Sequence, residues 1–316
     1  GGFLWRVRAD GGALPERIEL AGRGATIPSV ATGRDRLAFV RRLWDVDLYR
    51  LEPGGPPAPL VASTFGEWFP QYSPDGQRIA FQSDQSGGIW LVGADGSNPS
   101  RLTRGPNGDE GTPRWSPDGQ RVAFDSKPED GRRDVWTIGV DGSDLRQVTR
   151  APSEDNMPSW SRDGRFIYFS SDRTGRTEIW RVPAAGGTEE QVTHEGGCNP
   201  FESFDGKTLY SMRSCASDAL LARPTAGGPE RVVVPCVDAR SYAVGPQGIY
   251  YVECASQESP SRHVLRHLDT VTGRDREFGT FDSTWTAGIT VSPDGQTAVY
   301  GRSTGESDLM MIENFR

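Results

Sequence analysis

This chain of 316 residues has few histidines, and its one serine motif lacks the base that catalysis needs. Its histidines are His194, His263 and His267, and the last two stand four apart in a strand-rich stretch, where that spacing does not bring them onto one helical face. The segment Gly-Arg-Ser-Thr-Gly at 301–305 matches a nucleophile-elbow pattern around Ser303, but no histidine follows to act as its base. The sequence therefore predicts no catalytic residues, although an enzyme with an unrecognised site stays open as the alternative.

Carboxylates offer a different chemistry, because many of them fall in predicted loops. Carboxylate oxygens are ligands that Ca²⁺ prefers, and a group of them attracts a basic partner. Aromatic and methionine side chains beside them would supply the apolar centre of a contact. The candidate binding residues are Glu67, Trp68, Phe69, Asp109, Glu110, Glu154, Asp155, Asn156, Met157 and Trp285. The alternative is that these residues form an ordinary solvated surface. The strands and loops that carry them decide between a binding site and such a surface.

Those elements come from a repeated hairpin. The sequence reads "YSPDGQRIAF" at 72–81, "WSPDGQRVAF" at 115–124, "WSRDGRFIYF" at 160–169 and "VSPDGQTAVY" at 291–300. Each copy predicts a strand, a turn and a strand, because proline presets φ, aspartate bonds its own backbone and glycine adopts a positive φ. The aromatic and β-branched residues on both sides favour strands.

The spacing of the copies predicts the fold class. Prolines at 28, 70, 113, 158 and 200 open successive copies at steps of 42, 43, 45 and 42 residues, which is the period of a four-stranded propeller blade. We therefore expect an all-β chain that forms one domain over residues 1–316, a seven-bladed β-propeller of four-stranded antiparallel blades. The blades are predicted to start near residues 28, 70, 113, 158, 200, 239 and 287.

The two ends of the chain are predicted to close the ring. Residues 1–20 contain sequence typical of the third and fourth strands of a blade, and the chain ends with sequence typical of the first, second and third strands. The N- and C-terminal strands together would form the last blade, which leaves no open sheet edge. Both ends contain a third strand, and we favour 308–312 as the third and 17–20 as the fourth. The loops before first strands and after second strands then share one face, so the candidate binding residues gather at one mouth of the central channel.

The repeat text resembles TolB-type (WD40-like) propeller repeats. The likeness rests on Pro-x-Trp-Ser-Pro-Asp-Gly, Ile-Ala-Phe-x-Ser-Asp, Ile-Trp-x-Val-x-x-Asp-Gly and Arg-Leu-Thr, and it is strongest in the copies that start near Pro70, Pro113 and Pro158. The resemblance implies a propeller without implying one activity. Members serve as periplasmic binding modules, as sensory domains of bacterial winged-helix regulators and as gating domains of peptidases. The ending "SDLMMIENFR" at 307–316 is similar to that of the regulators.

Four cysteines form a duplicated arrangement. Cys198 precedes a predicted first strand and Cys215 follows its second strand, while Cys236 and Cys254 hold the matching places one blade later. Hairpin pairing brings the two members of each pair close together. Four cysteines allow three connectivities, and the duplication favours a disulfide within each pair, hence an oxidising compartment. Four reduced cysteines in a cytosolic protein remain the alternative.

Charge and composition limit the partners. A formal net charge of −8 argues against binding nucleic acid, and no apolar run is long enough to insert into a membrane. The chain starts at Gly1 without a signal-like segment, so we expect a processed chain or an excised domain. We predict a monomeric, non-catalytic module that binds a protein, peptide or other ligand at the channel mouth. It would be a sensory or scaffold domain in the periplasm or another extracytoplasmic space. The alternatives are a cytoplasmic location and a peptidase- or lyase-like enzyme or enzyme-gating propeller.

Overall fold

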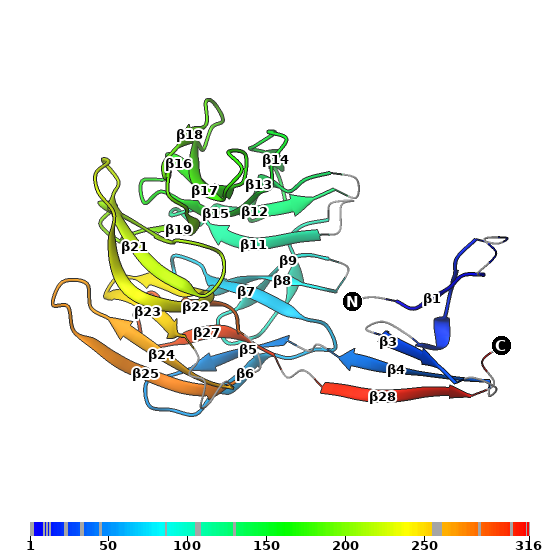
Figure 1. The fold of residues 1–316 in the computed structure, drawn as a ribbon. Coiled ribbons are helices and arrows are strands. Elements are labelled where there is room, and N and C mark those ends of the chain that lie inside the picture. The colour runs from blue at the N-terminus through cyan, green and yellow to red at the C-terminus, as the bar shows by residue number, and fades with distance from the viewer. Residues whose placement is uncertain are drawn as a thin grey trace. The chain divides into compact units, whose positions relative to one another are not determined.

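The chain folds into two compact units (Figure 1). The computed structural model describes residues 3–315 except for 9, 11, 13, 22–24, 32–34, 44–45, 86, 105–108, 129–130, 255–260, 284–285, 304–305 and 314. One unit, here the terminal unit, consists of Gly1–Asp45 and Ser303–Arg316, and the other, here the ring unit, consists of Val46–Arg302. In the described part of the chain, no helix has the length and apolar character needed to cross a membrane.

Three blades of the ring unit are continuous in the chain, and each has four antiparallel strands. They are β7 (Glu67–Tyr72), β8 (Arg78–Ser83), β9 (Gly88–Gly93) and β10 (Ser100–Arg101); β11 (Asp109–Trp115), β12 (Arg121–Lys127), β13 (Asp134–Gly139) and β14 (Arg146–Gln147); and β15 (Asp155–Trp160), β16 (Phe166–Ser171), β17 (Glu178–Pro183) and β18 (Glu190–Gln191). Phenylalanine faces tryptophan across the middle of each blade, at Phe81 and Trp90, Phe124 and Trp136, and Phe169 and Trp180. Such cross-strand aromatic pairs stabilise a sheet and explain the repeated tryptophan.

Two further blades share the long strand β22 (Arg231–Gly245) in a seven-stranded sheet. The first half of β22 pairs with β21, and the second half pairs with β23. The other strands of this sheet are β19 (Cys198–Glu202), β20 (Thr208–Met212), β21 (Asp218–Pro224), β23 (Gly248–Glu253), β24 (Arg262–Leu268) and β25 (Asp275–Asp282). β22 is thus the outer strand of one blade and the inner strand of the next.

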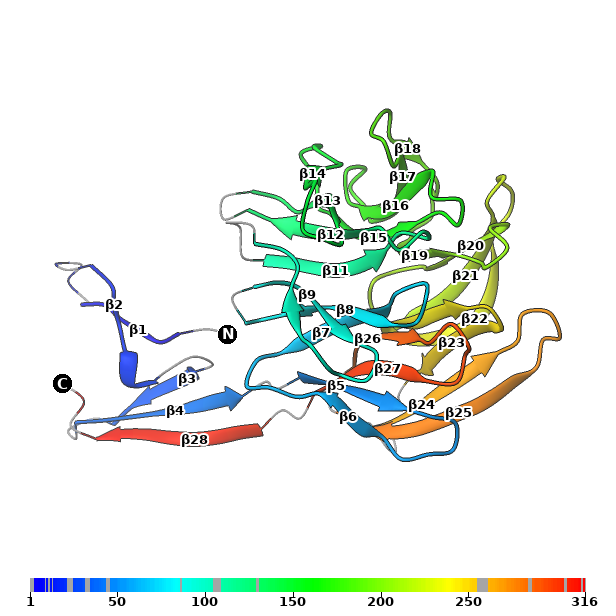
Figure 2. The ribbon, with the colours of Figure 1, turned by 180° about the vertical axis from the view of Figure 1, so that it is seen from behind.

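The last blade closes the ring with strands from both ends of the ring unit (Figure 2). Its order is β26 (Thr286–Val291), β27 (Ala298–Ser303), β5 (Val46–Leu51) and β6 (Ala58–Val61). The inner strands contact one another in a closed circle, in the order β7, β11, β15, β19, β22, β26 and back to β7. The described strands of the ring unit therefore make a six-bladed propeller.

The prediction of seven blades is not confirmed, because strands at the two ends take partners other than the predicted ones. The repeat predicts that β5 pairs with β4 (Arg36–Leu43), but β5 pairs with β27, and β4 pairs with β28 (Glu306–Glu313). Packing explains the exchange. Leu48 of β5 is buried in one cluster with Val299, and Leu51 is buried in another with Tyr300. Burial of these side chains stabilises the β5–β27 pairing.

The terminal unit has its own small core. β28, β4 and β3 (Ala25–Val30) form a three-stranded sheet, and β1 (Trp5–Arg6) pairs with β2 (Glu16–Arg17), which precedes the 3₁₀ turn Glu19–Ala21. Leu37 and Phe39 of β4 are buried together with Leu4, and Met310 and Ile312 pack against them. The expectation that residues 1–20 supply the outer strand of a ring blade stays a prediction, and in the structure β2 pairs with β1.

The structure contains two disulfides. Cys198 at the start of β19 bonds to Cys215, and Cys236 in the middle of β22 bonds to Cys254 after β23. The Cα atoms are 5.3 and 5.7 Å apart, inside the range that a disulfide needs. Each bond links the inner strand of a blade to the loop that follows its second strand.

Removal of residues 1–20 should leave the unfolding midpoint of the ring unit within about 2 °C of its intact value, less than the shift expected for 1 kcal/mol in a domain of this size. The reason is that all four strands of the closing blade lie after residue 45. Leu51→Ala is the matched control, because truncation of this fully buried side chain should cost about 2–5 kcal/mol. Calorimetry of both variants makes the comparison, and a large loss on truncation would mean that the ring closes through the N-terminal residues.

Reduction should loosen the two disulfide-linked blades before the others. The loops closed by the bonds span 17 and 18 residues, and the chain-entropy model assigns each about 3 kcal/mol. We expect faster hydrogen exchange in residues 198–254 after reduction, with 67–191 little changed. Mass spectrometry without reductant should find both linked peptides, and four free thiols in protein purified under oxidising conditions would contradict the pairing.

Candidate functional site

Most of the carboxylates predicted to bind a partner are buried and already bonded. Glu110 is buried and accepts a hydrogen bond from Thr103 Oγ1, and burial raises the pKa of its carboxyl. Asp155 is fully buried and pairs with Arg173 at 2.9 Å. Glu67 is buried and accepts a bond from Ser63 Oγ at 2.6 Å. These side chains hold neighbouring loops and strands together, which leaves them little capacity for a ligand.

The remaining predicted residues have differing surroundings. Asp109 is half exposed and pairs with Arg133, whereas the Glu154 backbone amide donates to Asp172. Trp68 and Asn156 are partly buried in the inner strands β7 and β15, and Trp285 lies outside the described residues. Within the described ranges, no three His, Cys, Asp or Glu side chains come together as a metal site needs. A Ca²⁺ ion at this face stays an untested prediction.

Phe69 and Met157 belong to a repeated backbone feature. One non-glycine residue in each of five inner strands has a φ between 45° and 60°, a left-handed conformation that most side chains avoid. These residues are Phe69, Thr112, Met157, Asn199 and Arg240. The amide of Met157 donates to Asp125 of the preceding blade at 3.2 Å, and the amide of Asn199 donates to Ser170 of its preceding blade at 3.1 Å. The strained residues thus tie adjacent blades together.

The opposite ends of the inner strands surround a cavity of about 250 Å³. Its rim contains the second residue of the hairpin turn in every blade of the ring unit. These six residues are Pro74, Pro117, Arg162, Phe204, Pro246 and Pro293. Further in, the lining includes Tyr72, Trp115, Trp160 and Phe201 from four neighbouring inner strands. The cavity is therefore at the mouth of the channel opposite to the predicted one, and its lining combines proline and aromatic side chains with polar and charged groups.

The hairpin turns that carry the rim are fixed by a repeated hydrogen-bond pattern. In the turn at 116–119, Ser116 Oγ donates to Asp118 Oδ1 at 2.6 Å, and the Gln120 amide donates to the same oxygen at 3.0 Å. Gly119 has a φ of 68°, which glycine adopts without strain. The turn at 203–206 keeps the pattern although phenylalanine replaces proline, because Ser203 still donates to Asp205 at 2.6 Å. The rim positions are held by backbone geometry, so their side chains are free to vary.

Two neighbouring rim positions carry a residue other than proline, Arg162 and Phe204, and their side chains interact. The Arg162 guanidinium lies 3.7 Å from the centre of the Phe204 ring, and Phe204 is 53% exposed. Glu202 beside them accepts a bond from the Arg162 amide at 2.7 Å and from the Tyr168 hydroxyl at 2.7 Å. Burial raises the pKa of Glu202 and lowers that of Arg162. An aromatic ring and a cation therefore stand at one side of an otherwise proline-lined opening.

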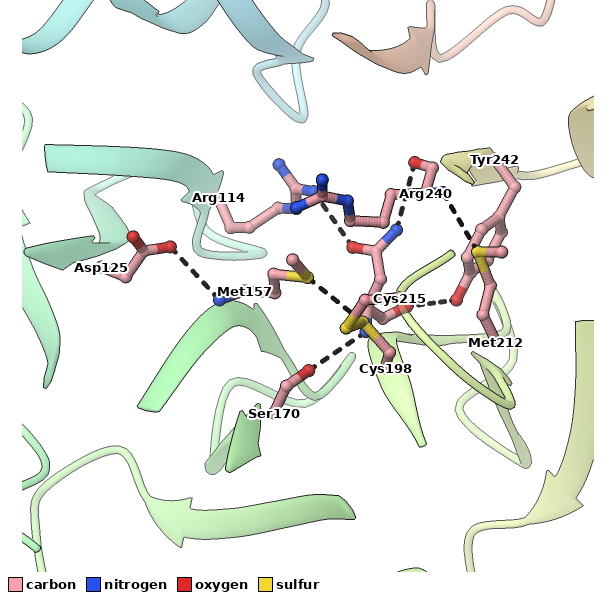
Figure 3. Close-up of a disulfide and its surroundings, with 10 residues drawn as sticks. Arg114, Asp125, Met157, Ser170, Cys198, Met212, Cys215, Arg240 and Tyr242 are labelled. Carbon is pink, nitrogen blue, oxygen red and sulfur yellow. Dashed lines mark hydrogen bonds between the residues drawn. A yellow bond between two sulfur atoms is a disulfide. The ribbon is translucent and has the colours of Figure 1, made fainter. Parts of the chain in front are cut away.

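Arg114 lines the cavity and is only 6% exposed. Its side chain extends from β11, and that of Arg240 approaches from the opposite side (Figure 3). Arg114 Nη1 donates to the carbonyl of Pro113 at 2.9 Å, and Nη2 lies 3.5 Å from Asn199 Oδ1. Burial lowers the Arg114 pKa to about 10. Sequence reasoning missed this arginine, because nothing in "PRWSPDG" distinguishes a buried arginine from an exposed one.

A closed ring of repeated blades around a channel cavity defines the class of protein, a β-propeller with a site on its axis. A model of the TolB beta propeller domain matches residues 105–278, more than half of the chain. The chain therefore belongs to the TolB beta propeller family.

Known proteins agree with this assignment. The chain is 32% identical over 204 residues to the uncharacterized protein Atu1656 of Agrobacterium fabrum, a match that covers 61% of this chain and 52% of that protein. The chain thus spans about half the length of this curated relative. A TolB-type structure from Agrobacterium tumefaciens is similar with a TM-score of 0.67 at 19% identity, over 82% of this chain and 98% of that one. TolB from Acinetobacter baumannii is similar with a TM-score of 0.59 at 20% identity, over 83% and 65%. At these identities the two structures support the fold alone.

Acid should weaken the turns that build the rim. The pKa is lowered for the turn aspartates Asp75, Asp118, Asp163, Asp205 and Asp294. The main cause is the serine hydroxyl bond, except at Asp163, where the Arg165 amide contributes most and the pKa falls to about 2. Because the folded pKa lies below the unfolded value of about 3.9, this stabilisation is complete above that pH and is lost as the pH falls towards 2.

Urea unfolding at pH 7, 4 and 3 measures this effect. The free energy of unfolding should fall between pH 4 and pH 3, and Asp163→Asn, which keeps an acceptor but cannot titrate, should flatten the dependence. Burial raises the pKa of Glu110 and Glu202, so their contributions to the free energy of unfolding change with pH in the opposite direction. Both proteins contain these two groups, so the difference between their pH dependences isolates the contribution of the Asp163 turn. Equal slopes for both proteins would rule out a contribution from the Asp163 turn.

Proposed function

We propose that this chain is a non-catalytic binding module that receives a protruding peptide segment of a protein partner in its central cavity. The observation that carries the proposal is the rim, in which the same turn position of six blades surrounds one opening. Proline and aromatic side chains have few conformations to lose, so such a surface binds at a low entropic cost. Buried aromatic residues and arginine are also the residue types that dominate binding energies at interfaces.

The size of the cavity favours the tip of a segment over a large ligand. Pockets for drug-sized molecules usually measure about 300–1,000 Å³, and this cavity of about 250 Å³ falls just below that range. One or two side chains fill such a volume, while the rest of the partner would lie across the rim. Phe204 and Arg162 project where the rim departs from proline, so they are suited to contact the part outside the cavity.

We further propose that the module works outside the cytoplasm, as the recognition part of a sensory or scaffold protein. The two disulfides support this location, because such bonds persist in oxidising compartments. The wide use of TolB-type propellers as binding modules is consistent with the recognition role.

A peptide selection tests the proposed site. Peptides selected from a displayed random library on the intact protein should bind at the rim, and Phe204→Ala and Trp160→Ala should each weaken them by about tenfold or more, equivalent to 1.4 kcal/mol. Asp109→Asn on the opposite face is the control and should change little. Intrinsic tryptophan fluorescence and calorimetry give the affinities. Peptides that depend on Asp109 but not on Phe204 would overturn the choice of face.

A further inference from the structure

The Arg114 guanidinium is buried without a counter-ion. Its partners are neutral, namely the Pro113 carbonyl and the Asn199 side-chain oxygen, and its Nε atom has no hydrogen-bond partner. The ring of Phe201 lies 5.0 Å from the guanidinium carbon. Among the described residues, no carboxylate forms an ion pair with Arg114. Buried arginines are normally paired, because an isolated charge in a protein interior loses its hydration without compensation.

The charge of Asp125 acts on Arg114, but Asp125 and the cavity residue Glu202 are both hydrogen-bonded to other groups. Asp125 accepts from Arg133 Nη1 at 2.6 Å, from the Met157 amide and from Thr112 Oγ1. Glu202 is occupied by the Tyr168 hydroxyl and the Arg162 amide.

Arg240 adds a second positive charge. It stacks over Phe69 at 5.8 Å, and burial lowers its pKa. Arg114 and Arg240 thus place two buried guanidinium groups near the channel, and the charge of Asp125 acts on both, although neither forms an ion pair with it.

This arrangement fits a negatively charged group supplied by a ligand. A guanidinium presents its N–H groups as a planar fork that matches the two oxygens of a carboxylate. The charged residues that line the cavity are Arg114, Arg162 and Glu202, and the charges of Arg162 and Glu202 act on each other. Within the lining, Arg114 is thus left with one positive charge for a ligand to balance. A phosphate dianion would leave one charge uncompensated among proline and aromatic side chains.

We propose that the central cavity binds a carboxylate group through Arg114. The inference rests on the proposed function for the source of the carboxylate, a side chain or the C-terminus of a peptide segment. It explains why a chain would keep an unpaired charge at the centre of its ring, since the ligand completes the ion pair. The bound carboxylate would accept hydrogen bonds from Nε and Nη2 of Arg114, with the ligand's apolar part against Phe201 and Trp115.

The first test measures stability without ligand. Arg114→Met keeps much of the side-chain volume and removes the unpaired charge, so its melting temperature should equal or exceed that of the unchanged protein. Arg165→Met, at an exposed arginine outside the cavity, is the matched control and should change little, because it removes only an exposed ion pair with Asp163 and keeps the Arg165 amide bond to that side chain. A large decrease for Arg114→Met would mean that the arginine is a structural support, which would overturn the proposal.

The second test uses hippurate, a small aromatic carboxylate, and its neutral analogue hippuramide. At constant ionic strength, hippurate should quench or shift tryptophan fluorescence and raise the melting temperature, with an affinity at least tenfold above that of hippuramide. Arg114→Met should remove this preference and Arg165→Met should keep it. Equal binding of the two compounds, or a preference that survives Arg114→Met, would overturn the carboxylate assignment and leave the peptide-binding proposal standing.

Peptide pairs identify the source of the carboxylate. Peptides from the selection above are compared as free acids and as C-terminal amides, and with each internal Asp or Glu replaced by its amide. If one replacement weakens binding to the unchanged protein but not to Arg114→Met, the replaced group is the carboxylate that contacts Arg114. If every replacement is neutral while hippurate binds through Arg114, the site takes a small acid, and the peptide-binding function fails separately. If neither class depends on Arg114, the inference is wrong.

Discussion

Closure of the inner circle of strands is the constraint on which the rest of the ring depends. Each inner strand must contact two neighbours, and the last contact, between β26 and β7, joins segments more than 200 residues apart in the chain. The amide of Tyr72 donates to Thr290 Oγ1 across this junction at 3.1 Å. Such non-local contacts form only after a large loss of chain entropy, so they are stable only as a set. The left-handed residues that tie one blade to the next are therefore tolerated, because a closed ring determines their geometry.

The same closure creates the candidate site. Six turns converge on the axis, and in five of them a serine–aspartate bond fixes the backbone whatever side chain stands at the second turn position. Variation at that position costs the fold little, as Arg162 and Phe204 show. The cavity below is closed on its sides by strands that cannot move independently, so Arg114 is held where water cannot easily replace a missing counter-ion. A repeated scaffold with local departures from the repeat is a simple way to combine stability with a specific surface.

Much of the fold could be predicted from the sequence, and the reasons for the errors are physical. The turn chemistry and the spacing of the prolines predicted four-stranded blades, and these are present between β7 and β25. Seven blades were not confirmed, because β5 pairs with β27 and β4 with β28, and the packing of Leu48 and Leu51 that accompanies this exchange cannot be read from the repeat. Glu110 and Asp155 of the predicted binding face are buried, although they look exposed in a loop-rich sequence. The groups that bond them, the Thr103 hydroxyl and the Arg173 guanidinium, come from the loops after β10 and β16, which no local pattern reveals. Arg162 and Phe204 were visible as departures from the turn pattern, and such departures are a better signal of function than the number of acidic residues.

A crystal structure of the intact protein soaked with 4-iodobenzoate tests the central claim most directly. The iodine atom locates the compound by its anomalous signal, independently of any effect on stability. The account predicts a peak inside the ring, with the carboxylate on Arg114 and the iodinated ring among Trp115, Trp160 and Phe201, and no such peak in Arg114→Met crystals. A peak at the opposite face near Asp109 and Glu154, or a carboxylate bound in the cavity away from Arg114, would contradict it.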